Sequence, residues 1–359
     1  MLNVRIVSSL VTNCYPLASS IPAADKLGFM LFLCKVQPAM QPGPLLSLIV
    51  PFYNVARYFA QLLDSIEQQL TEQVQVILIC DGATDGSLEL AQQHICSSAR
   101  PESYLLLCQA NAGVSLARNA GLAKAEGGYI GFIDADDIVL PGYISNVLAV
   151  ITEHQPDLIE LGYKRFTDAA ALNHAKERYL HRKQGWLEKH KAVKEVYQSS
   201  RWFPWLRIYR KNLMPDFQFP PGIAFCEDVM AMPALYQAAE RLYHLRLPLY
   251  GYREHCASAS FHVKTEHQQQ LQSFFNALRQ KHSLPALSER LRYILLFHLA
   301  YLLYKLQLSN QTQHSYPAEL DRQSKALIRK VWWWLGFSLR KKLHLAFAPF
   351  FFQRHRSKG

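Results

Sequence analysis

Three aspartates, Asp134, Asp136 and Asp137, stand within four residues where an apolar run of the chain ends. Neighbouring carboxylates repel one another, so without a cation they raise one another's pKa values and cost stability. Hard divalent cations such as Mg²⁺ or Mn²⁺ take oxygen ligands, usually one or two carboxylates together with substrate phosphates. A solvated acidic turn or a helix cap is the structural alternative. Because the cluster follows a predicted strand, we favour a site for Mn²⁺ or Mg²⁺.

A second acidic position, Asp81, is the first residue after the apolar run from Val74 to Cys80. Two Asp-Gly pairs follow and predict tight turns, and Asp85 or Ser87 can cap the next helix. Capping explains Asp85 better than it explains Asp81. A carboxylate at Asp81 can accept a hydrogen bond from the imide N–H of a uracil ring.

The elements that must position these residues alternate between strands and helices. Apolar runs predict strands at 46–50, 74–80, 104–107, 129–133 and 158–161. Helices of ten to fifteen residues fill the intervals, and the first is predicted to bury Tyr58, Leu62, Leu63, Ile66 and Leu70. This alternation predicts an α/β fold with a parallel sheet. Ligands of such sheets bind beyond the carboxyl ends of the strands, which is where the aspartates lie.

Four segments resemble the signature blocks of family 2 glycosyltransferases, in the family's order and at family-like spacing. They are 46–54 (LSLIVPFYN), 81–87 (DGATDGS), 111–121 (NAGVSLARNAG) and 133–137 (IDADD). The resemblance implies a GT-A fold, a UDP-sugar or similar nucleotide-sugar donor, a divalent metal, and inversion at the anomeric carbon. It is close over about 45–165 and looser over 166–262. The tail lies outside it.

The resemblance assigns the donor base to the first two blocks. Pro51 and Tyr53 resemble the residues that line the base, and Asp81 resembles the aspartate that binds uracil. The family usually has a second aspartate just before this one, where the chain has Cys80. Cys80 at this position affects which nucleotide base the donor site is expected to prefer. The loop after the first strand also lacks the Gly-x-Gly-x-x-Gly pattern, which argues against a dinucleotide-binding dehydrogenase.

The other two blocks are assigned to the sugar diphosphate. The positions that resemble the donor-side loop and helix are Asn111, Gly113 and Arg118. Asp136 and Asp137 resemble the pair at the ribose and the metal, with Asp134 beside them. Farther along, His262 is a weaker candidate for reaching the metal.

A third acidic position opens a predicted helix at Glu227 and Asp228. The helix dipole favours acidic residues in a first turn, so a purely structural explanation exists. By resemblance, Asp228 is the general base, and Glu227 orients it or binds the acceptor. Inversion by direct displacement needs such a carboxylate to take the proton of the attacking hydroxyl, and a cation to take up the charge of the departing diphosphate.

The expected organisation has three parts: an irregular extension at 1–44, a GT-A domain at 45–265, and a mainly helical region at 266–359. The GT-A domain divides into a donor half at 45–165 and an acceptor half at 166–265. In the acceptor half an aromatic-rich stretch either forms an acceptor platform or packs in the core; its residues are Trp202, Trp205 and Arg207.

The basic charge is concentrated at the C-terminus. Residues 322–359 contain ten Lys or Arg and no Asp or Glu, against a net charge of +11 for the chain. Nucleic-acid-binding proteins more often spread basic surface over the folded body, so we expect no nucleic acid partner. Tryptophans 332–334 and later aromatics alternate with the basic residues, a pattern typical of a helix lying in a membrane interface. The alternative is a helix that packs its tryptophans on the catalytic domain.

These features predict an inverting glycosyltransferase that acts on a glycan or lipid-linked acceptor in bacterial polysaccharide or lipopolysaccharide synthesis. It is expected in the cytoplasm, peripheral on the inner face of the cell membrane. The alternative is a catalytically inactive protein that binds nucleotide sugar, membrane or nucleic acid. Such a relative would be expected to have lost a metal or base carboxylate, and none is missing here. A nucleotidyltransferase is disfavoured because the Gly-rich phosphate loop expected near its start is absent.

Overall fold

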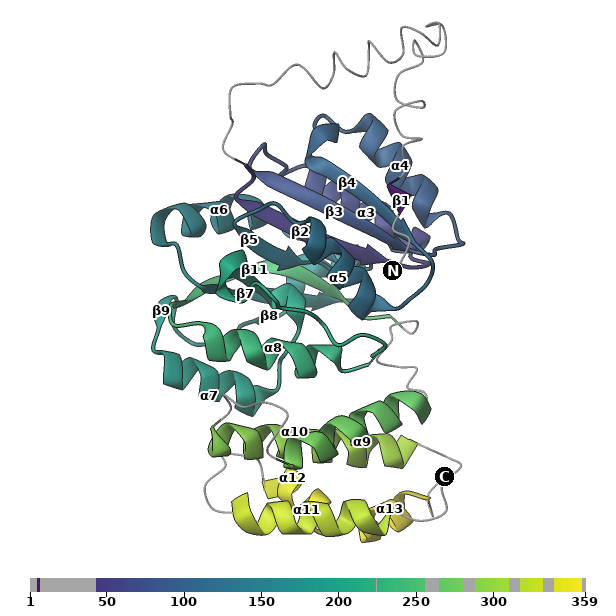
Figure 1. The fold of residues 1–359 in the computed structure, drawn as a ribbon, viewed down its shortest axis with the longest axis vertical. Helices are drawn as coiled ribbons and strands as arrows, with labels where there is room; N and C mark the ends of the chain where they lie inside the picture. Colours follow the sequence, from purple (N-terminus) through teal and green to yellow (C-terminus); the bar gives the residue numbers. More distant parts are fainter. Residues whose placement is uncertain are drawn as a thin grey trace, which may run out of the picture.

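The computed structural model describes residues 5–6, 43–223, 225–255, 265–280, 288–309, 317–331 and 339–356. A body built around one sheet carries a separate group of helices at one end (Figure 1). The predictions made for His262 and for the tryptophans at 332–334 lie outside the described residues.

The first half of the sheet is parallel, as the sequence predicts. Its order is β4-β3-β2-β5, and each strand is within a few residues of its predicted position. The strands are β2 (Leu46–Phe52), β3 (Val74–Asp81), β4 (Tyr104–Gln109) and β5 (Tyr129–Phe132). Because β2 is buried along its whole length, its sequence reads as a continuous apolar run and not as an alternation.

The second half of the sheet differs from the expectation of an all-parallel sheet. Strand β10 (Arg207–Arg210) lies antiparallel between β5 and β7 (Leu158–Phe166), and β11 (Leu242–Arg253) runs parallel to β7. The sequence of β10 is RIYR, which lacks the apolar run that marks the other central strands. Four short strands complete the sheet: β1 (Arg5–Ile6), β6 (Ile138–Val139), β8 (Glu177–Arg178) and β9 (Gly185–Leu187).

Helices cover both faces of the sheet and bury two hydrophobic clusters. One face packs on α3 (Ala56–Glu67), α4 (Ser87–Ser97) and α6 (Tyr143–His154), and the other on α5 (Val114–Lys124), α7 (Lys189–Ser199) and α8 (Glu227–Ala238). On α3 the buried face is Phe59, Leu62, Leu63 and Ile66. The predicted Tyr58 is instead half-exposed, because Phe59 takes the inward position.

The C-terminal helices are α9 (Thr265–Arg279), α10 (Glu289–Ser309), α11 (Ala318–Val331), α12 (Leu339–Ala346) and α13 (Ala348–Arg356). They form the lower group in Figure 1, with α10 next to the body and α11 to α13 on the far side. Their buried residues, such as Phe297 and Leu303 on α10, continue the core cluster that contains α8. None of the described helices combines the length and apolarity that a membrane span requires.

The N-terminal extension, expected to be irregular, contributes the strand β1. Arg5 pairs with Cys108 and Ile6 with Leu107 on β4, antiparallel. Among the cysteines of the described residues, Cys80, Cys108 and Cys226 are free thiols, whereas Cys96 is disulfide-bonded.

Candidate active site

The carboxyl end of β3 holds the first predicted site residue, Asp81. Its side chain is 4% exposed. One oxygen accepts hydrogen bonds from Gln109 Nε2 at 2.7 Å and the Ala112 amide at 2.8 Å, and the other from the Gly113 amide at 2.9 Å. A carboxylate offers about four lone-pair directions, so Asp81 fixes the loop before α5 and keeps little capacity for a base.

Glycine is required where β3 turns into this loop. Gly82 has φ +72°, and a Cβ there would lie 2.7 Å from the Asn111 amide nitrogen. The left-handed backbone and the close approach both exclude larger residues. The two predicted donor blocks are therefore in contact, and Asn111 lies exposed at the edge they form.

The remaining residues of the first two blocks separate into exposed and buried ones. Tyr53 is 49% exposed, which suits stacking on a base, whereas Pro51 is buried in β2. Cys80, at the departure from the family pattern, is 2% exposed and lies inside the sheet. Asp85 accepts hydrogen bonds from the amides of Ala56 and Ser87 at the starts of α3 and α4, as the capping explanation predicts.

The three aspartates after β5 have different surroundings. Asp137 is 1% exposed and accepts hydrogen bonds from Tyr250 Oη at 2.8 Å and the Arg253 amide at 2.7 Å. Burial, and then the charges of Asp136 and Asp134, raise the pKa of Asp137 well above its usual range. The side chains of Asp134 and Asp136 are 31% and 28% exposed, so they reach solvent where Asp137 does not.

Arg253 at the end of β11 and His255 just after it hold this cluster, and neither was among the predicted site residues. His255 Nε2 lies 2.8 Å from Asp136 Oδ2. The Arg253 side chain donates to the Asp136 carbonyl at 2.7 Å and to Gln61 Oε1 at 2.8 Å. A single Arg at the end of a strand and a single His after it give no periodic signal. The pairing of β11 with β7 and with β6, the short strand that follows Asp137, brings them to the site.

Arg118 connects the donor and acceptor halves. It is 3% exposed, and its guanidinium donates to Asp134 Oδ1 at 2.9 Å and to Glu227 Oε1 at 2.7 Å. Burial alone would lower the Arg118 pKa, but the charges of Asp134 and Glu227 outweigh it and raise the pKa. The predicted donor-side arginine is thus a buried bridge between the acidic cluster and α8.

Asp228 follows Glu227 in the first turn of α8 and is partly buried. Burial, and then the charge of Glu227, raise the pKa of Asp228 to about 7. A general base works best with a pKa near the operating pH. The residue before the helix, Cys226, has φ +63°, an uncommon conformation for a residue with a side chain that is often found at functional sites.

The third block also positions the loop that leads into α8. Asn119 donates through Nδ2 to the Phe219 carbonyl at 2.8 Å and accepts from the Phe219 amide at 2.8 Å. Ser115 Oγ donates to the Ile223 carbonyl at 2.8 Å. Both residues belong to segment 111–121, which resembles a signature block of the family, so the sequence marked these two positions. Their partners, about a hundred residues away, were not predictable from it.

The aromatic stretch of the acceptor half packs in the core. Trp202, Trp205 and Arg207 are at most 2% exposed, which supports core packing over an acceptor platform. Trp205 stacks on Tyr250 with ring centroids 4.4 Å apart, and Tyr250 in turn holds Asp137. Through Tyr250, the aromatic stretch therefore helps to hold Asp137 in place.

A divalent cation fits part of the predicted donor set. Asp134 and Asp136 supply two partly exposed carboxylates, and the pKa of Asp134 is raised by burial despite the neighbouring Arg118, with Asp136 adding to the rise. Within the part of the chain that the structure describes, no group of three or more His, Cys, Asp or Glu could hold a metal. Two carboxylates match a cation that completes its shell with water and phosphate oxygens.

Comparisons with known proteins place the chain beside glycosyltransferases. The family model described as "Glycosyl transferase family 2" matches residues 47–221. The chain is 31% identical over 214 residues to the uncharacterized glycosyltransferase EpsJ of Bacillus subtilis, covering 59% of this chain and 61% of the relative. It is 30% identical over 225 residues to the uncharacterized glycosyltransferase YibD of Escherichia coli, covering 60% and 63%. The match thus spans less than two thirds of the length of these relatives.

Among solved structures, S. aureus TarS 1–349 in complex with UDP-GlcNAc is similar with a TM-score of 0.62 and 18% identity. The similarity covers 87% of this chain and 92% of that one. At this identity the likeness concerns the fold. It confirms the predicted fold class, a GT-A-like α/β domain followed by a helical region.

Proposed function

Since the chain carries a family 2 glycosyltransferase domain at residues 47–221, we propose that the protein transfers a sugar from a nucleotide diphosphate to an acceptor hydroxyl with inversion. The supporting observation is the bridge through Arg118, which joins the acidic cluster after β5 to the start of α8. It brings a cation-compatible carboxylate pair and a carboxyl with a pKa of about 7 to the same edge of the sheet.

In this proposal Asp228 accepts the proton of the acceptor hydroxyl as its oxygen attacks the anomeric carbon. The oxygen approaches from the side opposite the departing diphosphate, which gives inversion. Asp134 and Asp136 would hold Mn²⁺ or Mg²⁺, which supplies charge stabilisation to the departing diphosphate. Asp137, assigned to the metal by resemblance, is better suited to positioning, because its two oxygens already accept hydrogen bonds from Tyr250 and Arg253.

A uridine donor is supported by the exposed ring of Tyr53 and by the TarS complexes with UDP and UDP-GlcNAc. Asp81 would act mainly by holding the loop at Gly113 under the nucleotide. A role in bacterial cell-surface polysaccharide synthesis is supported by relatives named for surface polymers. One is the Bacillus subtilis minor teichoic acid biosynthesis protein GgaB, 38% identical over 114 residues, 31% of this chain and 12% of that one.

The test is a panel of nucleotide sugars with Mn²⁺ and with Mg²⁺, scored for donor hydrolysis and for transfer. The anomeric configuration of the product is then read by proton NMR. We expect a UDP-sugar to be consumed only with a divalent cation and the product to be inverted. A retained configuration would refute the role of Asp228. Tight nucleotide-sugar binding without turnover on any donor would favour the inactive binding protein.

We also propose that α12 and α13 dock on an anionic membrane surface. Four large apolar side chains there are exposed by 36–62%: Leu339, Leu343, Phe347 and Phe350. Backbone hydrogen bonds from Phe347 to Leu343 and from Phe351 to Phe347 continue the helical turns between the two helices. Spacings of four, four and three residues then place the four side chains on one face.

Basic residues accompany this apolar stripe in the first turn of α12, at Arg340, Lys341 and Lys342. Each Lys or Arg near an anionic leaflet contributes about 1 kcal/mol, and apolar side chains in the interface add to it. This arrangement supports a peripheral position on the inner face of the cell membrane, next to a lipid-linked acceptor.

Sedimentation of the full-length protein with anionic liposomes at low salt tests the docking. We expect binding that high salt releases and that the double variant Phe347→Ser, Phe350→Ser weakens. Trp186→Ser is the matched control, since Trp186 is 49% exposed on the body. If the double variant and the control bind as well as the unmodified protein, the stripe is not the docking surface.

A further inference from the structure

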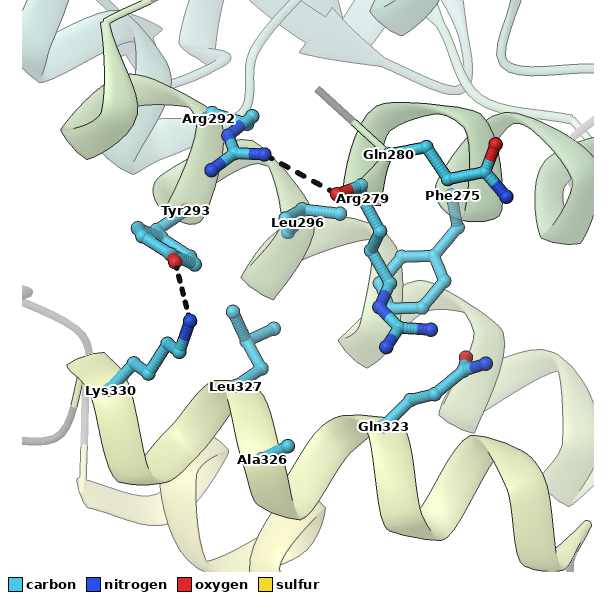
Figure 2. A pocket seen from close by; sticks show the side chains of 10 residues that line it. All are labelled: Phe275, Arg279, Gln280, Arg292, Tyr293, Leu296, Gln323, Ala326, Leu327 and Lys330. Atoms are coloured by element: carbon cyan, nitrogen blue, oxygen red, sulfur yellow. Dashed lines mark hydrogen bonds between the residues drawn. The ribbon is translucent and has the colours of Figure 1, made fainter. Parts of the chain in front are cut away.

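A cavity lies among the C-terminal helices α9, α10 and α11, away from the acidic edge of the sheet at Asp134, Asp136 and Asp137. It encloses about 340 Å³, within the range of small-molecule pockets. Figure 2 shows side chains from the three helices facing it: Phe275, Arg279, Gln280, Arg292, Tyr293, Leu296, Gln323, Ala326, Leu327 and Lys330.

The lining is strongly cationic. Arg279, Arg292 and Lys330 contribute three positive charges from three helices, and none of the described residues that line the cavity is acidic. Arg292 is 8% exposed, whereas Arg279 and Lys330 are exposed at the rim. Three positive charges around one cavity make it favourable for an anion.

The contacts of the buried Arg292 are weak. Arg292 donates to the Arg279 carbonyl at 3.4 Å and lies 5.2 Å from the Tyr293 ring centroid. Glu289 is 3.8 Å from Arg292, but its side chain is 68% exposed, so solvent screens that pair. Lys330 Nζ donates to Tyr293 Oη at 3.0 Å. A buried guanidinium held this loosely keeps donors for a charge-assisted hydrogen bond.

An acceptor lies beside these donors. Gln323 is 7% exposed and donates through Nε2 to Glu319 at 2.5 Å. Its Oε1 has no hydrogen-bond partner among the described residues. A buried polar atom without a partner costs free energy, and here it matches a ligand hydroxyl. The remaining wall is apolar, formed by Phe275, Leu296 and Leu327.

From this arrangement we propose that the cavity between α9, α10 and α11 binds a phosphorylated organic molecule. The phosphate would lie against Arg279, Arg292 and Lys330, a hydroxyl against Gln323, and the apolar part against Phe275 and the leucines. A lipid phosphate and a soluble sugar or polyol phosphate share this chemistry. The site is separate from the acidic edge, so the inference does not rest on the proposed transfer reaction.

Isothermal titration calorimetry of the full-length protein tests the site with three probes. They are dihexanoyl phosphatidic acid, glycerol 3-phosphate, and dihexanoyl phosphatidylcholine as the zwitterionic control. Binding of phosphatidic acid alone would assign the site to a lipid, and equal binding of glycerol 3-phosphate would assign it to a soluble ligand. If neither anionic probe binds, or if phosphatidylcholine binds as well as phosphatidic acid, the proposal is wrong.

Two variants connect binding to the cavity. The double variant Arg279→Gln, Lys330→Gln should weaken affinity for the anionic probe by at least about tenfold, since each removes a charge-assisted contact. Ala326→Phe should also weaken binding by filling the cavity while leaving its charges in place. Lys325→Gln is the matched control, because Lys325 lies on α11 outside the lining and pairs with Asp321.

Thermal unfolding of each variant establishes that it is folded, and donor hydrolysis measured in parallel should be unchanged. If the variants bind like the control, binding takes place elsewhere, the exposed stripe of α12 and α13 included, and the cavity is only a packing gap.

Discussion

The acidic edge of the sheet and the helical C-terminal region differ in how their charged side chains are paired and exposed. At the edge, Arg118 is buried and paired with two carboxylates at 2.9 and 2.7 Å. In the helical region, cations such as Arg279 and Lys330 lie exposed around a cavity whose described lining contains no acid. A buried, paired charge fixes geometry, whereas exposed cations around a cavity can attract an anion. The first arrangement suits catalysis, and the second suits capture of an anion.

The largest expected effect comes from breaking the buried bridge. Arg118→Met leaves Asp134 and Glu227 without their shared cation and should lower the free energy of unfolding by about 3–5 kcal/mol. The matched change in the helical region, Lys325→Met, removes an exposed pair and should cost about 0.5 kcal/mol or less. Urea denaturation measures both. Equal costs would show that the two regions do not differ as described.

The next largest effect concerns the proposed base. Asp228→Asn should lower the transfer rate by at least about 10² while donor affinity stays the same. Asp216→Asn changes an exposed carboxylate in the same half of the body and serves as control. Single-turnover kinetics and calorimetry with the donor separate the two steps. Transfer near the unmodified rate would place the base elsewhere.

A smaller effect is expected from Asp137. From the sequence alone, Asp137→Ala is expected to abolish metal-dependent donor binding while leaving the fold intact, because it relieves repulsion among the aspartates. In the structure the substitution removes the acceptor for Tyr250 Oη and the Arg253 amide. Leaving buried donors without partners costs about 1–3 kcal/mol, so we expect a net loss of stability in thermal unfolding. An unchanged or higher melting temperature would favour the repulsion argument.

The smallest effect is a shift in pH dependence. A general base is active when ionised, so transfer should fall as the pH drops below about 7, the pKa of Asp228. Glu227→Gln removes the charge that raises this pKa and releases the positive charge of Arg118, which lowers it. Both changes should move the midpoint of the acidic limb downward by about one unit, equivalent to about 1.4 kcal/mol. A pH–rate profile in which the midpoint stays fixed or rises would contradict this coupling.

Local patterns determined the parallel half of the sheet and the positions of most site residues. The strand ends at Asp81 and Asp134 were predictable because a buried parallel strand is a continuous apolar run that stops at its first polar residue. The helix start at Glu227 was predictable from its acidic first turn, and α8 begins at that residue. The resemblance added roles to these positions, and those roles remain predictions.

Only the tertiary structure decided which of these residues touch. Residues about 110 positions apart, such as Arg118 and Glu227, meet because β10 inserts antiparallel between β5 and β7. No local pattern encodes that insertion. Burial of Asp137, and the partnership of His255 with Asp136, follow from the pairing of β11 with β6 and β7. Periodicity in the sequence reports on neighbours three or four residues apart, whereas contacts between strands and between helices depend on the fold of the whole chain. The cavity among α9, α10 and α11 is formed by such contacts between helices.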